Sequence, residues 1–434
     1  MAPNSFSELS YKITKIISKK EKQDDGIYFT PPKTVIRCIE LLAGAATFNN
    51  ILEPSCGSCE FIEKLKGCYP EATITGVEYN KTVYENIRKA YGEYGAYHDN
   101  NANIKIIEGD FLIDAQTGFA DTPKFDLIIG NPPYYVMKKA DVKSDYYDYF
   151  DGRPNIFILF IIKSLTLLTD DGILCFVLPK SFLNCLYYNK TRKYIYDNYS
   201  ILSIEECDDN YIDTEQPTII FMIQKKDTDA TAASADANDK YIIRHLANEY
   251  TIFSTSEVIK RLDELYVGAT TLNALQFKVS VGNIVWNQHK ADLTGDPEKT
   301  RLIYSQDIKN NTLSIKDYTN AAKKNHINKK GCDEPLLVVN RGYGVGNYNF
   351  EYALINCGFH EGHLIYIKEY LIENHLICIK YAAGGDVDAY ALGEKYINIY
   401  KSFGDKRTLE FIKLYFGNNA INTTELLNIL PIYL

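Results

Sequence analysis

The chain has 434 residues, 46% of them hydrophobic, and a formal net charge of −9. This length and apolar content predict two, or at most three, folded domains and exclude global disorder. No apolar run reaches the roughly 18 to 20 residues of a membrane span, and the polar first 23 residues lack the apolar core of a signal peptide. The ten cysteines are scattered, which is typical of a reduced protein, so we expect a cytoplasmic location.

The acidic balance argues mildly against a nucleic-acid partner, but the charge is unevenly distributed. The segment 278–330 carries ten basic side chains against five acidic ones. Contact with a phosphate backbone requires a local basic face and not a basic protein. A nucleic-acid partner is therefore compatible with this sequence.

Taken in chain order, Met1 to Gln23 reads as a helical lead-in with one apolar face. A turn follows in which Thr30 precedes two prolines, so Thr30 is a candidate N-cap with Pro31 at the first helical position. Apolar residues at helical spacing continue to about residue 46. A helix start that bears a threonine could receive a carboxylate, although a plain capped helix explains the same residues.

Three predicted strands then each end at an acidic residue. The first, Asn50 to Glu53, breaks into a turn of small residues (54–61), the second ends at Glu78, and the third ends at Asp110 beside Phe111. Strand, small-residue turn and helix is the layout of a Rossmann-type ligand loop, and the second acid is placed where a carboxylate can bind a ribose. The pair Cys56 and Cys59 has no partner at metal-ligand spacing, so we expect no metal.

A fourth predicted strand, Phe125 to Gly130, runs directly into Asn131-Pro132-Pro133-Tyr134. Open α/β sheets bind ligands at the carboxyl ends of their strands, which is where this turn lies. Two consecutive prolines stiffen the turn and donate no hydrogen bond, leaving an amide, a carbonyl and an aromatic face at fixed positions. Such a turn suits a planar group that bears an amino group, such as adenine.

The remaining pattern alternates helix and strand and closes with two strands, Ser200 to Cys207 and Thr218 to Gln224. It predicts a doubly wound α/β sheet of about seven strands for residues 1–226. Residues 227–240 lack large apolar side chains and read as a linker. Residues 241–434 show short strands such as Leu336 to Asn340 and 364–367, a glycine-rich turn (341–348) and late helices, which predict a separate α+β domain.

Taken together, these motifs resemble the gamma-class N6-adenine DNA methyltransferases of the Taq type, found in type II restriction-modification systems. The resemblance covers about residues 26–225 and rests on an ordered set of blocks: Tyr28-Phe29-Thr30-Pro31-Pro32, Glu53-Pro54-Ser55-Cys56-Gly57, Gly76-Val77-Glu78, Gly109-Asp110-Phe111-Leu112 and Asn131-Pro132-Pro133-Tyr134. It implies a Rossmann-like methyltransferase sheet, S-adenosylmethionine as cofactor, duplex DNA as partner and residues 241–434 as a target-recognition domain. We expect a monomer. A fused nuclease is not expected, because too few residues precede Thr30 to hold one, so any cognate endonuclease would be a separate protein.

The resemblance also implies a role for each residue in these blocks. The cofactor's methionine end is assigned to Thr30, Glu53 and Ser55, its ribose to Glu78, and its adenine to Asp110 and Phe111. Asn131, which also borders the cofactor, and the Pro132 carbonyl would accept hydrogen bonds from the target N6 amino group, while Tyr134 and Tyr188 (or else Tyr187) would contact the flipped base. The expected DNA contacts are Lys323, Lys324, Lys329, Lys330 and Arg341. Cys59 departs from the pattern, because the family usually has glycine there, and its Cβ must fit beside the cofactor or shift the loop.

Three other functions remain open at this stage. A release-factor-like protein glutamine methyltransferase also uses Asn-Pro-Pro-Tyr, but it would not need some 190 residues after the catalytic sheet. An RNA adenine methyltransferase would share the same chemistry. A catalytically idle DNA-binding specificity protein would have no use for the intact acids and Asn131.

Overall fold

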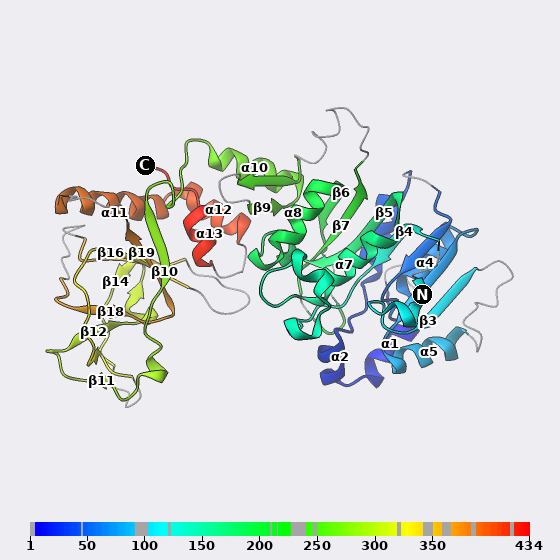
Figure 1. Ribbon diagram of the computed structural model, residues 1–434, viewed down its shortest axis with the longest axis horizontal. Helices are drawn as coiled ribbons and strands as arrows, with labels where there is room; N and C mark the ends of the chain where they lie inside the picture. Colours follow the sequence, from blue (N-terminus) through cyan, green and yellow to red (C-terminus); the bar gives the residue numbers. More distant parts are fainter. Residues whose placement is uncertain are drawn as a thin grey trace. The chain divides into compact units, whose positions relative to one another are not determined.

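The computed structural model describes residues 5–44, 47–91, 103–119, 123–208, 211–214, 216–226, 240–245, 250–318, 323–341, 350–357, 366–382, 388–416 and 421–434. The chain divides into two compact units, residues 1–259 and 260–434 (Figure 1). In the described part of the chain, no helix combines the length and apolar character needed to cross a membrane.

The first unit is built on a seven-stranded sheet in the order β3-β2-β1-β4-β5-β7-β6. Strand β7 is antiparallel to both of its neighbours, and the pairs from β3 to β5 are parallel. The strands are β1 (Asn50–Glu53), β2 (Thr73–Glu78), β3 (Ile104–Glu108), β4 (Phe125–Gly130), β5 (Leu168–Pro179), β6 (Tyr199–Glu206) and β7 (Thr218–Lys225). The predicted doubly wound, seven-stranded fold class is confirmed. The strand order reverses between β1 and β4, so a ligand crevice is expected at the carboxyl ends of these two strands.

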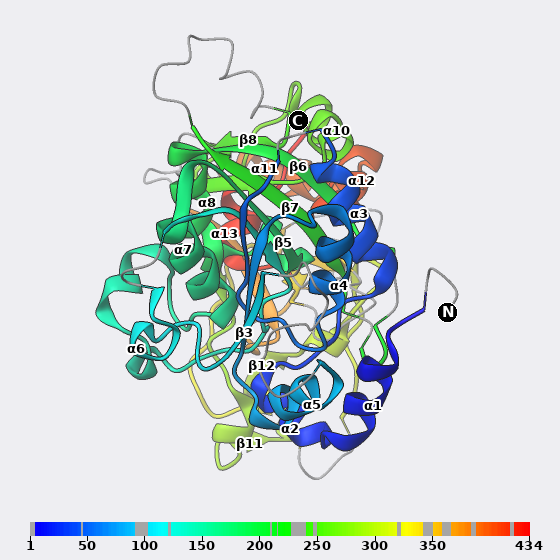
Figure 2. The ribbon, with the colours of Figure 1, turned by 90° about the vertical axis from the view of Figure 1, so that its right-hand side faces the viewer.

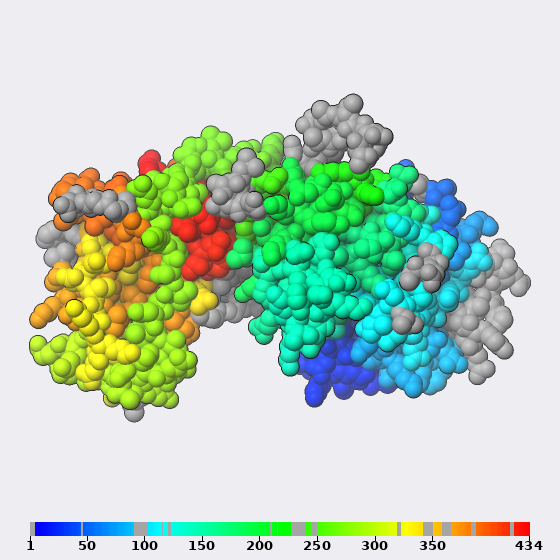
Figure 3. All heavy atoms as spheres, in the orientation of Figure 1, coloured from blue at the N-terminus to red at the C-terminus, as the bar shows by residue number. Residues whose placement is uncertain are grey.

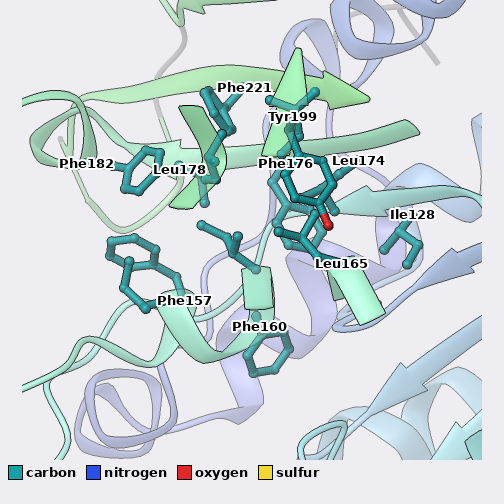
Figure 4. Close-up of a cluster of buried hydrophobic side chains, with 14 of the residues drawn as sticks. Ile128, Phe157, Phe160, Leu165, Leu174, Phe176, Leu178, Phe182, Tyr199 and Phe221 are labelled. Atoms are coloured by element: carbon teal, nitrogen blue, oxygen red, sulfur yellow. The ribbon is translucent and has the colours of Figure 1, made fainter. Parts of the chain in front are cut away.

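Alternating strand residues face two separate apolar layers, as the period of two in a strand requires. In β4, Ile128 packs into one layer, whereas Leu127 and Ile129 pack into the other. Figure 4 shows the first layer around Phe157, Phe176 and other labelled side chains. Helices α3 and α4 cover one face of the sheet and α7 and α8 cover the other (Figure 2). Burial on both faces explains why these strands read as continuous apolar runs.

The helices of the first unit follow the predicted pattern, with two differences. They are α1 (Glu8–Ile16), α2 (Lys19–Asp25), α3 (Pro32–Leu42), α4 (Glu60–Cys68), α5 (Lys81–Tyr91), α6 (Asp114–Thr117), α7 (Ile156–Leu167) and α8 (Asn189–Asn198). The lead-in is two helices, because it breaks between residues 16 and 19. The predicted N-cap was wrong: Pro31 is the capping residue of α3, and no side chain caps this helix. Thr30 is instead buried, only 5% exposed.

A two-stranded hairpin follows the catalytic sheet, formed by β8 (Ile242–His245) and β9 (Tyr250–Phe253). It belongs to the first unit, and its residues Tyr241, Ile242 and Phe253 are part of the same apolar layer as the sheet. The sequence placed residue 241 at the start of the second domain, whereas the compact units divide within α10 (Ser256–Tyr266). Most of the expected linker, residues 227–239, lies outside the described residues.

In its described residues, the second unit contains two four-stranded sheets, a short hairpin and, after the end of α10, three α-helices. One sheet has the order β10 (Phe277–Val281), β19 (Leu376–Tyr381), β16 (Leu336–Asn340) and β17 (Tyr352–Ile355). The other has the order β11 (Leu293–Thr294), β15 (His326–Ile327), β12 (Thr300–Ile303) and β18 (Tyr370–Ile372). The hairpin is β13 (Ile308–Lys309) with β14 (Thr312–Leu313), and the helices are α11 (Ala389–Phe403), α12 (Lys406–Tyr415) and α13 (Thr423–Asn428).

Two expected features of this unit fall on residues that are only partly described. Positions 342–349 of the glycine-rich turn lie outside the described residues. The expected strand at 364–367 lies partly outside them, and its described residues 366 and 367 carry no strand.

Candidate active site

Two adjoining pockets open at the carboxyl ends of the central strands, where the sheet topology predicts a crevice. The larger encloses about 770 Å³, open mouth included, and Ser55, Glu78, Asp110, Phe111 and Asn131 are among its lining residues. The smaller encloses about 240 Å³ and is lined in part by Thr30, Glu53, Ser55 and Asn131. Seven of the residues that the sequence predicted for the site therefore line these two pockets.

Glu78 terminates β2 in a buried position, 7% exposed, on the wall of the larger pocket. One carboxylate oxygen accepts a hydrogen bond from the Gly57 backbone N–H at 2.9 Å, and the other accepts from Asn80 N–H at 2.7 Å. Burial nevertheless dominates and raises the pKa of Glu78 to about 7. Donors from a ligand would favour the ionised form, so this carboxylate suits a pair of ribose hydroxyls.

Glu53 terminates β1 and is only 2% exposed. Burial raises its pKa well above the ordinary range of a carboxyl. Its Oε2 atom has no hydrogen-bond partner within the described residues. An unpartnered buried carboxylate oxygen is costly unless a donor arrives. An ammonium group of a ligand in the smaller pocket would supply that donor.

Asp110 follows β3 and is partly exposed to the larger pocket. Its Oδ1 accepts from Leu112 N–H at 2.9 Å, which fixes the carboxylate on its turn. Beside it, Phe111 is 1% exposed and packs against Phe160 with ring centroids 5.0 Å apart. Both rings border the pocket. A carboxylate acceptor next to an apolar aromatic wall can bind the amino edge and the face of an adenine ring.

The turn between β1 and α4 has the geometry that a close-approaching ligand needs. Gly57 has φ +51°, and a Cβ there would lie 3.2 Å from the Phe29 ring, so only glycine fits without displacement. Cys59 also has a positive φ, 66°, which explains why a glycine is usual at this position. Its side chain is fully buried in the apolar layer and does not line the smaller pocket. It is also absent from the lining of the larger pocket, so its Cβ adds nothing to the wall of either pocket.

Asn131 is held by three hydrogen bonds that involve its side chain or carbonyl. The side-chain amide Nδ2 donates to the Tyr28 carbonyl at 3.3 Å, and the Ser55 hydroxyl donates to the Asn131 carbonyl at 3.1 Å. The Tyr134 hydroxyl donates to Asn131 Oδ1, and it also lies 2.7 Å from the Val177 carbonyl. Because a carbonyl can only accept, the Tyr28 contact fixes the amide so that Oδ1 is its acceptor side.

The two aromatic residues assigned to the target base are linked by one side chain of α7. The Phe157 ring meets Tyr134 edge-on with centroids 6.1 Å apart, and it meets Tyr188 edge-on at 5.0 Å. Both tyrosines are partly buried and line neither pocket, so they do not belong to the cofactor site. Pro132 is buried and also lines neither pocket. Tyr187, the alternative to Tyr188, is 56% exposed.

Several lining residues were not identified from the sequence as cofactor contacts. The main set is Asp25, Gly26, Ile27, Tyr28, Phe29, Tyr79, Asn80 and Tyr135. Gly26 shows why the first of these segments is close: its φ is +67°, and a Cβ there would lie 2.9 Å from Pro133 Cβ. The lead-in therefore packs directly on the Asn-Pro-Pro-Tyr turn. The available signal was the glycine before Ile27, which marks a helix C-cap.

The segment 138–152 that follows this turn is largely exposed. It forms part of the face of the first unit that Figure 3 shows in teal, and it includes the short 3₁₀ helix Ser144–Tyr149.

Within the described residues, no group of three or more His, Cys, Asp or Glu side chains could hold a metal ion.

The predicted DNA contacts lie in the second unit and have different environments. The Lys323 ammonium lies over three rings, those of Trp286, Tyr304 and Tyr318, at 5.5, 4.8 and 5.5 Å. Lys329 lies 3.7 Å from Asp292. Lys330 is exposed, Lys324 is partly exposed, and Arg341 donates its backbone N–H to the His375 carbonyl at 3.1 Å.

The sheet order and the carboxylates at successive strand ends form a Rossmann-like ligand site at the place where the sequence predicted one for S-adenosylmethionine. Comparison with known proteins agrees: residues 46–212 match the family model of the Eco57I restriction-modification methylase. The chain is 28% identical to the type II methyltransferase M.CvrRI of Paramecium bursaria Chlorella virus XZ-6E over 96% of both chains. It is 35% identical to the modification methylase CviBIII of Paramecium bursaria Chlorella virus NC1A over 48% of this chain and 52% of that one. The predicted resemblance to type II restriction-modification methyltransferases is confirmed.

One solved structure with a similar sheet is the methyltransferase subunit of a type I restriction-modification system from Streptococcus thermophilus. It is 19% identical, with a TM-score of 0.40, and the overlap covers 56% of this chain and 53% of that chain.

Proposed function

We propose that this enzyme transfers a methyl group from S-adenosylmethionine to the N6 amino group of an adenine in duplex DNA. The observation that carries the proposal is the preset amide of Asn131, whose Oδ1 is fixed as an acceptor beside the pocket. An acceptor of this kind matches an exocyclic amino group, which has two hydrogens to donate.

The cofactor fits the residues that line the two pockets. Glu53 has an unpartnered buried oxygen for the amino group of the methionine end, with Thr30 and Ser55 beside it. Glu78 would bind the ribose hydroxyls, and Asp110 with Phe111 would bind the adenine. When bound, S-adenosylmethionine supplies an electrophilic methyl group on a sulfonium.

The protein's own contribution is to make a poor nucleophile reactive. The lone pair of adenine N6 is delocalised into the ring, so the free amino group attacks slowly. Asn131 Oδ1 and the Pro132 carbonyl would accept one hydrogen each, which favours the pyramidal amine and localises its lone pair. Acceptors fixed before the substrate arrives cost no reorganisation during the reaction. No covalent intermediate is needed.

A base in a duplex cannot reach this turn, so the target adenine would leave the helix at a cost of a few kcal/mol. The rings of Tyr134 and Tyr188, both supported by Phe157, would offset that cost by contacting the flipped base. We assign DNA affinity and sequence choice to the domain after the linker 227–240. Its phosphate contacts would come from the partly or fully exposed lysines Lys324 and Lys330 together with Lys329 and Arg341.

Radiolabelled methyl transfer to duplex DNA, RNA and protein separates this proposal from its alternatives. We expect label in DNA only, recovered as N6-methyldeoxyadenosine after enzymatic digestion, and lost with Asn131→Ala. Label recovered as a methylated cytosine, in RNA or in a glutamine side chain would contradict the proposal and identify that group as the substrate. DNA binding without transfer to any substrate would indicate an idle specificity protein. Sequencing of modified bases in DNA from cells that express the protein would give the recognition site.

A further inference from the structure

The most unusual side chain outside the pockets is Arg192 in α8, which is fully buried. Arginine stays protonated in proteins, so a buried guanidinium carries a full charge that must be compensated. Arg192 forms no ion pair with any carboxylate of the described residues, and its Nη2 has no partner there. Its compensation comes from three backbone carbonyls and from the Tyr250 ring, over which the guanidinium lies at 5.7 Å.

Two of these carbonyls belong to the loop that carries Tyr188. Nη1 donates to the Phe182 carbonyl at 2.9 Å and to the Cys185 carbonyl at 2.8 Å. Phe182 lies in the 3₁₀ helix Lys180–Leu183, and Cys185 precedes the next one, Leu186–Tyr188. One nitrogen therefore fixes the chain between the end of β5 and the aromatic residue assigned to the target base.

The third carbonyl belongs to β9, the strand that sequence reasoning had placed in another domain. Arg192 Nε donates to the Thr251 carbonyl at 2.6 Å. On the same strand, Thr251 N–H donates to Asn189 Oδ1 at 2.8 Å, and the Tyr250 hydroxyl donates to the Asn184 carbonyl at 2.6 Å. Strand β9 is thus hydrogen-bonded to the loop on both sides of Tyr188.

Aromatic packing also joins strand β9 to the loop that carries Tyr188. Phe253 of β9 stacks on Phe221 of β7 with ring centroids 5.9 Å apart, and it meets Phe182 edge-on at 6.2 Å. Phe182 in turn lies 6.4 Å from Tyr188. The hairpin therefore contacts the loop through a polar hub, Arg192, and an aromatic support.

We propose that Arg192 is a positioning residue for the target-base pocket: with β9 it presets the loop 182–188, so that the Tyr188 ring is in place when the base leaves the helix. The inference rests on the proposed function, since it needs a base that Tyr188 receives. It also gives the hairpin after the linker a role in positioning the target base.

The test compares Arg192→Met, which removes all donors, and Arg192→Lys, whose single nitrogen cannot span three carbonyls, with the wild-type enzyme. The matched control is Arg244→Met, in strand β8, whose guanidinium lies over the Tyr196 ring at 4.5 Å. Each protein is assayed on two unmethylated duplexes that contain the recognition site. One duplex is fully paired, and in the other the target adenine lies opposite an abasic site, where flipping is easier. Calorimetry with S-adenosylmethionine confirms a folded cofactor pocket.

We expect both Arg192 variants to bind cofactor within twofold of wild type. Turnover should fall at least tenfold on the normal duplex. The fold-loss on the abasic duplex should be at most one third of the fold-loss on the normal duplex. Arg244→Met should match wild type on both. Tyr250→Phe, which removes the bond to the Asn184 carbonyl, should show the same pattern more weakly, and it keeps the proposal testable if the Arg192 variants do not fold.

Equal losses on both duplexes would make Arg192 merely structural, and unchanged turnover on both would remove any role in positioning; either result overturns the proposal. Failure of the proposed function looks different, because wild type itself would then methylate neither duplex.

Discussion

Glu78 offers a prediction in which stability and cofactor binding oppose each other. Burial raises the pKa of this carboxyl from 4.5 to about 7. A raised pKa means that the folded state holds the proton more tightly than the unfolded state. The stabilisation is complete below pH 4.5 and is lost as the pH rises through 7. A shift of this size corresponds to about 3 kcal/mol in all, of which about 2 kcal/mol falls between pH 5.5 and 8.5.

The perturbation is Glu78→Gln, which cannot ionise. Glutamine retains one acceptor, so it loses one of the two backbone N–H bonds at every pH and is destabilised by a constant amount. Against that offset, the unfolding free energy of the variant relative to wild type should improve by about 2 kcal/mol from pH 5.5 to 8.5. Glu71→Gln, at an exposed position before β2, is the control for the loss of one carboxylate. Circular dichroism is the suitable probe, because the only tryptophan, Trp286, lies in the second unit.

Cofactor binding should also report on the ionisation of Glu78, through the protons released on binding. Ribose hydroxyls that donate to Glu78 favour its ionised form, so binding at pH 6 should release about one proton and at pH 8.5 almost none. Calorimetry in buffers of different ionisation enthalpy measures that release. If the stability difference between Glu78→Gln and wild type is flat with pH, and binding heats do not depend on the buffer, the reasoning about burial of Glu78 is refuted.

The remaining predictions concern single positions. Asn131→Ala should lower turnover by about 100-fold or more while cofactor affinity is kept, because a preset acceptor is lost; near-normal transfer to duplex DNA would contradict the role of this amide. Tyr134→Phe keeps the aromatic face and should lose less than about tenfold, whereas Tyr134→Ala should lose more, since base stacking contributes about 1–3 kcal/mol; equal losses would assign the chemistry to the hydroxyl. Cys59→Gly should relieve the backbone strain of a positive φ. Cofactor affinity measured by calorimetry should stay within twofold of wild type, and the unfolding free energy should stay within about 1 kcal/mol. Neutralising Lys324 and Lys330 together should reduce the salt slope of DNA binding by about two, and an unchanged slope would place the phosphate contacts elsewhere.

The sheet and its polar strand ends were predictable because their signals are local. An apolar run followed by a small-residue turn and an acid marks a buried parallel strand, and parallel strands bring their carboxyl ends to one edge. Glu53, Glu78, Asp110 and Asn131 could therefore be grouped without knowing any contact between them. The structure lines adjoining pockets with all four.

What could not be predicted depends on contacts between distant segments. The brace from β9 to α8 joins Thr251 to Arg192 through a backbone carbonyl, and a carbonyl has no signature in the sequence. The packing of Gly26 on Pro133 is equally long-range. Thr30 looked like a helix cap because its neighbours are prolines, yet Pro31 takes that position and Thr30 is buried. Lys323 was predicted to contact DNA from its place in a basic segment, which gives no sign of the three rings that its ammonium lies over.

The hydrogen bonds around Asn131 suggest how one acceptor can serve both the empty and the occupied site. Without a base, the Tyr134 hydroxyl satisfies Oδ1, which would otherwise be an unpaired acceptor. The same hydroxyl has a second acceptor, the Val177 carbonyl at 2.7 Å, toward which its proton can turn. An arriving amino group can therefore take over Oδ1 without leaving the tyrosine unpaired, while the Tyr28 carbonyl keeps the amide from rotating. The residue that would contact the base thus also satisfies, in the empty site, the acceptor that would activate it.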